Sequence, residues 1–329
     1  MNNILFPVLS ILSDGKFHSG EKMSGQLNVS RSSVWMAVEN AGQIGVKIFS
    51  VRGKGYKLTH PIQLLDKNKI KLSLGEISSR VNIEVLDVVN STNSYLLKES
   101  AKNIPHASCI AANIQTHGKG RRGRHWQSAL GESLTFSYLW RFNFGSASLS
   151  GLSLTIGIAL IRSLKKIGIN DALVKWPNDI LVFNDNSYKK LAGILIELQG
   201  DSVGQSAAII GVGINLNLSK NQLNKIDQPA IDINQCLGNE VNPNEFLGIL
   251  LNNLTEVLSI FQDTQFSSFK DEWISYHAYQ DKPVKLILGN NEVVEGRVSN
   301  ISPEGSLVIQ TDKGERSFTS GEISIKEFI

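Results

Sequence analysis

The sequence contains 329 residues, of which 41% are hydrophobic and 19% charged, and its formal net charge is +3 at pH 7. This length predicts two or three domains with sizeable apolar cores, and so small a net charge does not by itself indicate a nucleic-acid partner. The two cysteines, Cys109 and Cys236, lie too far apart for a disulfide framework or a cysteine metal site. No run of about 18 apolar residues and no secretory leader pattern is present, so we expect a soluble cytoplasmic protein without a membrane partner.

The first region, residues 1–63, is the most basic part of the chain, with seven cations against three acids. Apolar spacing predicts a helix around residues 8–12, and Ser19 and Ser30 stand where they would cap two further helices. Residues 46–58 then alternate around a Gly-Lys-Gly turn, which predicts a β-hairpin. Three short helices followed by a basic hairpin are the element order of a winged helix-turn-helix DNA-binding domain.

The second region, residues 64–275, begins with a linker that passes into a helix and then alternates strand and helix patterns. Segments rich in branched and aromatic residues predict strands at 83–89, 108–116, 132–142, 172–176, 179–184, 190–198 and 207–218. Two long amphipathic patterns predict helices at 148–168 and 242–262. Many strands with interspersed helices indicate a mixed α/β layer domain, so the fold class of the chain is α+β (mixed α/β) and multidomain.

The third region, residues 276–329, contains strand patterns alone. They cover 284–289, 292–302, 306–311 and 316–325, with turn signals at 289–291, 303–305 and 312–314. Four or five short strands within about 50 residues are typical of a small SH3-like β-barrel.

The segment HGKGRRGRHW, residues 117–126, carries four cations among three glycines. It contains G-x-G-x-x-G at 118–123, but a dinucleotide-binding fold needs a helix directly after the glycines, and here another loop and a strand follow. No Gly-Lys-Ser/Thr of a Walker loop is present either. Glycines let backbone N–H groups approach an anion and arginines offer planar forks, so we expect a loop that is mobile when empty and orders on a polyanion. On composition alone, a solvated basic turn fits equally well.

Two further segments place polar groups beside predicted strands. VKWPNDILVF, residues 174–183, puts Lys175 at a strand end, where it could bridge two anions, and Asn178 and Asp179 could hold a hydrated Mg²⁺. The alternative is an ordinary Pro-Asn-Asp turn. VVNSTNSYLL, residues 88–97, places Ser-Thr-Asn before a helical run, where plain helix capping accounts for it at least as well.

Taken together, these segments resemble the biotin protein ligases, in the bifunctional bacterial form that is also the biotin operon repressor. The most specific part of the resemblance is the pair GKGRRGRHW and KWPND, supported by FHSGE, GKGY, DVVNSTNSYLL, KLAGILIEL and GVGINLN. The resemblance implies a winged helix-turn-helix domain over 1–63, a catalytic domain of the biotin/lipoate ligase type over 64–275, and an SH3-like barrel over 276–329.

The resemblance also implies a two-step reaction. The biotin carboxylate attacks the α-phosphate of ATP, which gives biotinyl-5′-AMP and pyrophosphate, and a lysine amine of the biotin carboxyl carrier protein then attacks the adenylate. Mg²⁺ would accompany the triphosphate, and no resident metal of the protein is expected. Positioning and charge neutralisation would carry the catalysis, without a covalent enzyme intermediate.

Site residues follow from the matching motifs. Lys175 and Arg121 are the implied catalytic residues, the first between carboxylate and α-phosphate and the second against phosphate charge. The implied biotin contacts are Ser91, Thr92, Asn93, Gln115, Lys119, Gly120, Arg121 and Lys175. The implied contacts to ATP and the adenylate are Gly118, Arg124, Trp126, Asn178 and Asn215.

The N-terminal unit would contact operator DNA of the biotin operon. The expected contacts are Ser19, Arg31, Ser32, Ser33, Arg52 and Lys54. The recognition helix departs from the repressor pattern, since Met36 and Ala37 stand where polar and basic side chains are usual, and Glu39 would face phosphate unfavourably if exposed. The resemblance further implies an adenylate-promoted homodimer on a two-fold operator.

Three alternatives remain at this point. A ligase with a vestigial winged domain would show the same site without operator binding. A lipoate ligase of the same fold would make no use of a Ser-Thr-Gln cluster, because lipoate has no ureido ring. A ligand-sensing regulator without enzymatic activity would need no lysine poised at a phosphate.

Overall fold

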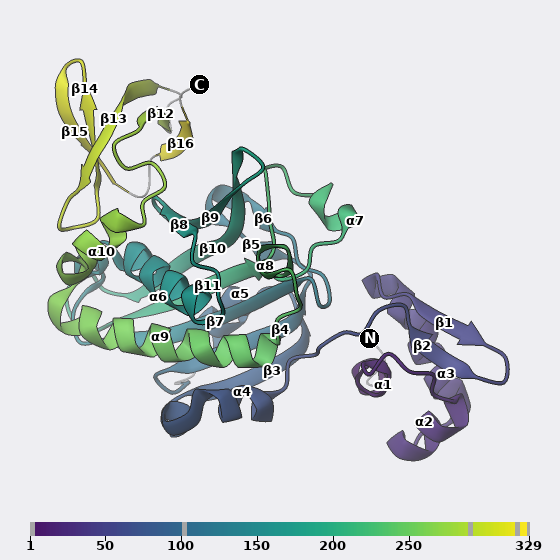
Figure 1. Cartoon of the computed structure of the whole chain (residues 1–329). Coiled ribbons are helices and arrows are strands. Elements are labelled where there is room, and N and C mark those ends of the chain that lie inside the picture. The colour runs from purple at the N-terminus through teal and green to yellow at the C-terminus, as the bar shows by residue number, and fades with distance from the viewer. Residues whose placement is uncertain (1–3, 101–103, 289–291, 320–322, 328–329) are drawn as a thin grey trace.

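The computed structural model describes residues 4–100, 104–288, 292–319 and 323–327, and its elements form three successive bodies (Figure 1). The N-terminal unit consists of α1 (Leu5–Leu12), α2 (Gly20–Leu27), α3 (Arg31–Ala41), η1 (Gly42–Ile44), β1 (Ile48–Val51) and β2 (Gly55–Leu58). Ser19 and Ser30 each accept a hydrogen bond from the backbone N–H three residues later, which confirms both predicted helix caps. The helices and hairpin occur in the predicted winged helix-turn-helix order.

One glycine fixes the place where this hairpin meets the rest of the unit. Tyr56 of β2 pairs with His18, just before α2, through two backbone hydrogen bonds of 2.9 and 2.8 Å. Gly55 has φ +97°, and a Cβ there would lie 2.1 Å from the carbonyl oxygen of His18. Only glycine lets the two backbones come this close, so the second glycine of the Gly-Lys-Gly turn is a structural requirement.

The central body is built on a seven-stranded sheet. Its strands are β3 (Asn82–Val89), β4 (Ser108–Gln115), β7 (Ser133–Phe142), β8 (Ala172–Lys175), β9 (Asp179–Asn184), β10 (Ser187–Gly200) and β11 (Ser206–Asn215). Their order is β3-β4-β7-β11-β10-β9-β8, and the β3–β4 pair is parallel while the other neighbours are antiparallel. All seven predicted strands of this region are confirmed, and so is the mixed α/β layer.

Helices cover both faces of this sheet (Figure 1). The long helices α6 (Leu152–Lys166) and α9 (Pro243–Thr264) share one core cluster with Cys109 of β4, whereas α5 (Thr92–Ser100) shares a second cluster with Ile110. Because neighbouring residues of a strand point to opposite faces, α5 lies on the face opposite α6 and α9. The shorter helices are α4 (Lys67–Leu74), η2 (Gly75–Ser79), η4 (Ser146–Leu149), α7 (Lys220–Leu223), α8 (Ile233–Leu237), η5 (Phe266–Phe269) and α10 (Lys270–Ser275).

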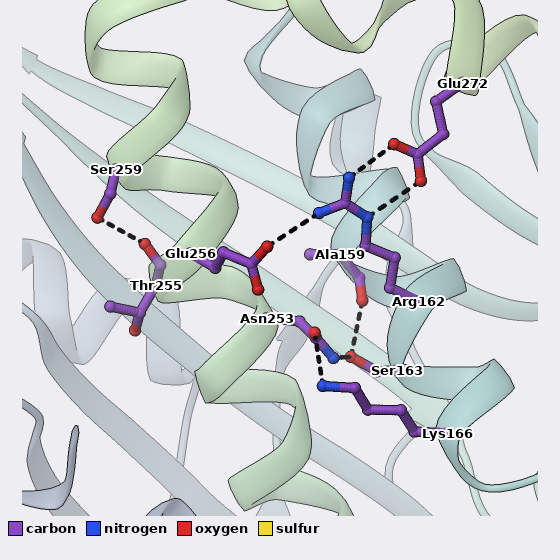
Figure 2. Close-up of polar contacts among 9 residues, drawn as sticks. All are labelled: Ala159, Arg162, Ser163, Lys166, Asn253, Thr255, Glu256, Ser259 and Glu272. Atoms are coloured by element: carbon purple, nitrogen blue, oxygen red, sulfur yellow. Dashed lines mark hydrogen bonds and ion pairs between the residues drawn. The ribbon is translucent and has the colours of Figure 1, made fainter. Parts of the chain in front are cut away.

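An arginine of α6 ties α9 and α10 together (Figure 2). Arg162 donates from Nε and NH2 to the two carboxylate oxygens of Glu272 at 3.0 and 2.7 Å, and from NH1 to Glu256 at 3.4 Å. The next residue of α6, Ser163, accepts a 2.7 Å hydrogen bond from Asn253 of α9. The hydrogen bonds to Glu272 raise the pKa of Arg162, as a bidentate pair does. This network fixes α10, which leads into the last body.

The C-terminal β-domain, as we call residues 283–327, is one antiparallel sheet. Its strands are β12 (Pro283–Leu288), β13 (Val293–Ile301), β14 (Leu307–Thr311), β15 (Gly314–Phe318) and β16 (Ile323–Glu327). They are arranged in the order β15-β14-β13-β12-β16. The predicted all-β character and the turns at 303–305 and 312–314 are confirmed, while the predicted turn at 289–291 lies outside the described residues.

The linker between the N-terminal unit and the central body is held by two asparagines. Asn113 of β4 accepts a hydrogen bond from the backbone N–H of Leu65 at 3.0 Å. Asn244, near the start of α9, accepts from the N–H of Asp66 at 2.7 Å and donates to the carbonyl of Leu64 at 3.1 Å. The linker is therefore part of the folded structure. Within the described residues, no helix has the length and apolar character to cross a membrane.

Candidate functional site

A cavity of about 1080 Å³ lies between the start of α5, the 117–126 loop and strands β10 and β11. It collects nearly all of the ligase residues predicted from the sequence, although they are spread over more than a hundred positions. Those that line it are Ser91, Thr92, Asn93, Gln115, Lys119, Gly120, Arg121, Arg124, Trp126, Lys175, Asn178 and Asn215. Gly118 is just outside the lining and pairs with Trp126 in the short ladder of β5 (Gly118–Lys119) and β6 (His125–Trp126).

One end of the cavity is lined by buried polar side chains that carry no charge, those of Ser91, Thr92, Asn93 and Gln115. The side-chain oxygen of Gln115 accepts from the backbone N–H of Thr92 at 2.7 Å and from its hydroxyl at 3.1 Å. Ser137 Oγ lies 2.7 Å from Thr92 Oγ1 and 2.5 Å from Asn93 Oδ1. Two donors on one oxygen set the orientation of the Gln115 amide, which leaves its Nε2 group for a ligand acceptor. This end suits a neutral ring that carries both donors and acceptors.

Two glycines of β11 make room for this polar end. A Cβ at Gly211 would lie 2.2 Å from Asn93 Oδ1, and one at Gly213 would lie 2.4 Å from the indole of Trp126. Both glycines line the cavity, so the close approach of Asn93 and Trp126 to the strand shapes its wall. Both glycines occur in the GVGIN motif, whose sequence pattern predicts a strand but no site role for them.

The other end of the cavity is cationic. Arg121 NH1 donates to Asn178 Oδ1 at 3.0 Å, and Asn178 in turn donates to the carbonyl of Ile194 at 2.9 Å. Burial and the charge of Arg122 lower the pKa of Arg121, while Asp179 opposes that shift. Basic side chains exceed acidic ones around the cavity, since it is lined by Lys119, Arg121, Arg122, Arg124, Lys175, Lys190, Lys225, Asp179 and Asp227. Such an excess favours an anionic ligand.

Sequence reasoning missed a second lysine in this cationic end. Lys190 of β10 lines the cavity and pairs with Asp179 at 2.8 Å, and its Nζ lies 5.8 Å from the ring centre of Trp126. Lys175, the predicted catalytic lysine, places its Nζ 6.0 Å from the ring centre of Tyr279. The sequence signal is the lysine that opens KLAGILIEL, a segment whose pattern predicts only a strand. The cavity therefore contains two lysines that could neutralise an anion.

Asp179 is engaged by this ion pair, and Asn178 by Arg121 and Ile194. Among the described residues, no group of three or more His, Cys, Asp and Glu side chains is placed to hold a metal ion. A Mg²⁺ at Asn178 and Asp179 stays a prediction, and one carboxylate with an amide would hold it only together with phosphate oxygens of a nucleotide.

The glycine- and arginine-rich loop folds back on itself over the cavity. The backbone N–H of Gly120 donates to the carbonyl of Arg124 at 2.7 Å, and Arg122, within η3 (Arg121–Gly123), has φ +56°. Lys119 reaches Glu197 of β10 at 3.7 Å. No helix opens after the glycines, which confirms that this G-x-G-x-x-G is not a dinucleotide-binding turn. The mobility expected of the empty loop stays a prediction.

Asn215 closes the cavity on a third side. Its side-chain amide donates to the carbonyls of Lys190 and Ile231 at 3.1 and 3.0 Å, and Lys190 N–H donates to the carbonyl of Pro229 at 2.8 Å. These contacts hold the segment 225–230 against the cavity, where it contributes to the lining. The sequence had placed Asn215 among ATP contacts but gave no signal for this segment.

The predicted DNA contacts lie together in the N-terminal unit, away from this cavity. Arg31 and Ser32 are exposed at the start of α3, and Arg52 and Lys54 are exposed on the turn between β1 and β2. Ser19 caps α2, and the hydroxyls of Ser32 and Ser33 both contact that of Ser30, which caps α3. The roles of all six residues in DNA binding stay predictions.

Comparison with known proteins agrees with this geometry. The sequence matches the Biotin/lipoate A/B protein ligase family over residues 85–215, the Biotin protein ligase C terminal domain over 281–326 and an HTH domain over 5–57. It is 36% identical to the bifunctional ligase/repressor BirA of Salmonella typhimurium, over 97% of this chain and 96% of that protein. The chain belongs to the biotin protein ligase family. The BirA protein of Escherichia coli K12 is 34% identical over 99% of this chain and 98% of that protein.

A solved structure supports the placement in the biotin protein ligases. The biotin protein ligase from Aquifex aeolicus in complex with biotin and ATP is 28% identical and superposes with a TM-score of 0.63. The match covers 75% of this chain and 99% of the Aquifex chain. The bifunctional relatives cover almost the whole of this ligase, including its HTH region, so the resemblance seen in the motifs is confirmed.

Proposed function

We propose that this biotin protein ligase converts biotin and ATP into biotinyl-5′-AMP, transfers the biotinyl group to a lysine of the biotin carboxyl carrier protein, and represses the biotin operon. The observation that carries the ligase function is the two-ended cavity. A neutral, hydrogen-bonding end at Gln115 and Thr92 faces the same space as a cationic end at Arg121 and Lys190. Biotin plus a nucleotide phosphate is a ligand with these two ends.

In the first step the biotin carboxylate attacks the α-phosphorus of ATP, and the bond to pyrophosphate breaks. Both reactants are anionic, so the main task of the protein is to screen their repulsion and hold them in line. Lys175, Lys190 and Arg121 line the cavity and supply that positive charge. ATP enters as its Mg²⁺ complex, and the ion travels with the triphosphate.

In the second step an acceptor lysine amine attacks the acyl carbon, and AMP leaves with its phosphate oxygen. The adenylate must survive until that lysine arrives, and a loop that excludes water protects it. The 117–126 loop suits this role because it folds over the cavity and brings Lys119, Arg121 and Arg124 with it. No nucleophilic side chain of the enzyme is required.

The repressor function rests on the N-terminal unit, whose winged helix-turn-helix order and exposed basic wing suit operator DNA. A homodimer formed with the adenylate bound would present two such units to a two-fold operator. A lipoate ligase is disfavoured, because the hydrogen bonds that orient Gln115 through Thr92 would serve no group of lipoate.

The deciding experiment is incubation of the full chain with ATP, Mg²⁺, biotin and a carrier-protein domain, followed by mass measurement of the carrier. We expect the carrier to gain the mass of one biotinyl group. The matched reaction with lipoate in place of biotin should leave the carrier unmodified. A carrier that is unchanged with biotin, or modified equally well with lipoate, would overturn the proposed ligase function.

A further inference from the structure

Helix α3, the second helix of the helix-turn-helix, has one exposed stripe. It consists of Arg31, Ser32, Trp35, Met36 and Glu39. The opposite face, formed by Val34, Ala37, Val38 and Ala41, is buried in the core of the N-terminal unit. Ala37 therefore lies away from the stripe, and the apolar character of Met36 and Trp35 is the real departure from a polar recognition helix.

Two large apolar side chains form the centre of this stripe. Trp35 is 54% exposed and Met36 is 47% exposed, so neither contributes fully to the core. The other three residues of the stripe are polar or charged, and a solvated face would carry such side chains throughout. Two adjacent exposed apolar residues form one small patch, which on the second helix of a helix-turn-helix is a candidate binding surface.

The charge around the patch indicates what it binds. Arg31 lies at the N-terminal end of α3, and the first turn of the helix contains no acid. Arg52 and Lys54 are exposed on the turn between β1 and β2 of the same unit. An apolar helix face that begins with an arginine, in a unit whose hairpin turn is also basic, matches a DNA major groove, which is bordered by phosphates and contains base edges. A polyanion pairs with all three of these cations, whereas the same stripe on a second copy offers one acid, Glu39.

We propose that α3 reads thymine methyl groups in the major groove through Trp35 and Met36. The C5-methyl group of thymine is the one apolar feature that a base pair presents in that groove, and apolar side chains contact it. Glu39, at the far end of the stripe, is an acceptor for the cytosine amino group. This inference rests on the proposed repressor function and adds the class of base that the protein recognises.

The test begins with selection of duplexes from a random DNA pool by the full chain with biotin and MgATP. The selected duplex is then remade with single thymines replaced by uracil, which removes only the methyl group. We expect about fivefold weaker binding or more at two or more thymines of each half-site. Uracil duplexes that bind as tightly as the thymine duplex would overturn the inference while leaving DNA binding intact. Failure to select any duplex would overturn both the repressor function and the inference.

Variants distinguish recognition of thymine methyl groups from electrostatic attraction to the DNA phosphates. Trp35→Ala and Met36→Ala should each remove the preference for thymine over uracil and leave the salt dependence of binding unchanged. Arg52→Ala should weaken thymine and uracil duplexes alike and reduce the salt dependence. Leu72→Ala, which truncates a side chain 85% exposed on α4 of the central body, is the control and should change neither property. If Trp35→Ala instead abolishes self-association and leaves the thymine preference intact, the stripe is a protein interface and the inference is wrong.

Discussion

The indole Nε1 of Trp176 donates a hydrogen bond to the backbone carbonyl of Gly305, 3.0 Å away, and so joins the ligase cavity to the C-terminal β-domain. Trp176 is fully buried and stands between Lys175 and Asn178, which both line the cavity. The turn that contains Gly305 also accepts a 2.6 Å hydrogen bond at Glu304 from Ser150, just before α6. The β-domain thus supports the strand turn that presents the cationic end of the cavity.

This support predicts that Gly305→Ala slows adenylate formation by about tenfold, because small displacements of positioned groups reduce the rate steeply. Gly305 has φ +82°, and a Cβ there would lie 2.7 Å from the Cα of Gly151. Gly314→Ala is a matched control, since Gly314 also has a positive φ of +101° in the same domain but its Cβ would meet nothing within 4 Å. Biotin-dependent pyrophosphate release measures the rate. Equal rates in the two variants would show that the contact with Gly151 does not matter.

The two lysines of the cationic end can be compared directly. We expect Lys175→Ala and Lys190→Ala each to lower adenylate formation by roughly 10²–10³-fold, the cost of losing one donor aimed at developing charge. Isotope exchange between pyrophosphate and ATP in the presence of biotin measures this step without the carrier protein. If one variant exchanges at a near-normal rate, the lysine that it lacks does not contribute to catalysis. The other lysine is then the only ammonium that bridges the two anions.

The 117–126 loop over the cavity predicts how much biotinyl-5′-AMP escapes from the enzyme. Gly120→Ala would bring a Cβ to 3.3 Å from the carbonyl oxygen of Arg124, which already accepts the hydrogen bond from Gly120 N–H. We expect this crowding to disturb the closed loop and to increase severalfold the biotinyl-5′-AMP released into the medium. Gly42→Ala, in an open position of the N-terminal unit, is the control and should release no more than the wild type. Unchanged release by Gly120→Ala would contradict the protective role of the loop.

Much of the fold and most of the site could be predicted from the sequence, because the deciding signals are local. Branched and aromatic runs between turn residues identified all seven strands of the central sheet, and Ser19 and Ser30 marked two helix starts. Residues that occur in short motifs, such as Lys175 and Asn178 in KWPND, were found at the cavity for the same reason.

The residues that sequence reasoning missed act through long-range contacts. Ser137 and Lys190 lie within strands, where their neighbours predict only strand structure. Their roles appear once β7 brings Ser137 against the cavity residues Thr92 and Asn93, and β10 brings Lys190 to the cavity. Asp179 was considered as a magnesium ligand because its ion pair with Lys190 could not be seen from the motif. The β9–β10 pairing that joins these two residues depends on the sheet order, which local patterns do not contain.

A buried histidine at the entrance to the C-terminal β-domain predicts how stability depends on pH. His277 packs its ring 4.6 Å from that of Trp273, and burial lowers the pKa of His277 to about 3. In the unfolded chain the imidazole titrates near pH 6.5. Between about pH 3 and 6.5 the unfolded state therefore binds more protons, so the free energy of unfolding falls as the pH is lowered through this window. Within this window one such histidine changes the free energy of unfolding by about 1.4 kcal/mol per pH unit.

His277→Phe isolates this contribution, since phenylalanine keeps a ring against Trp273 but cannot bind a proton. Urea unfolding of the wild type and the variant at pH 6.5, 5.5 and 4.5 gives the two slopes, and other titrating groups cancel in their difference. We expect the wild type to lose about 1.4 kcal/mol more than the variant for each pH unit below about 6. If the free energies of unfolding of the wild type and the variant depend on pH in the same way, His277 stays accessible to protons in the folded protein. A neutral imidazole buried beside Trp273 would have to make the two slopes differ.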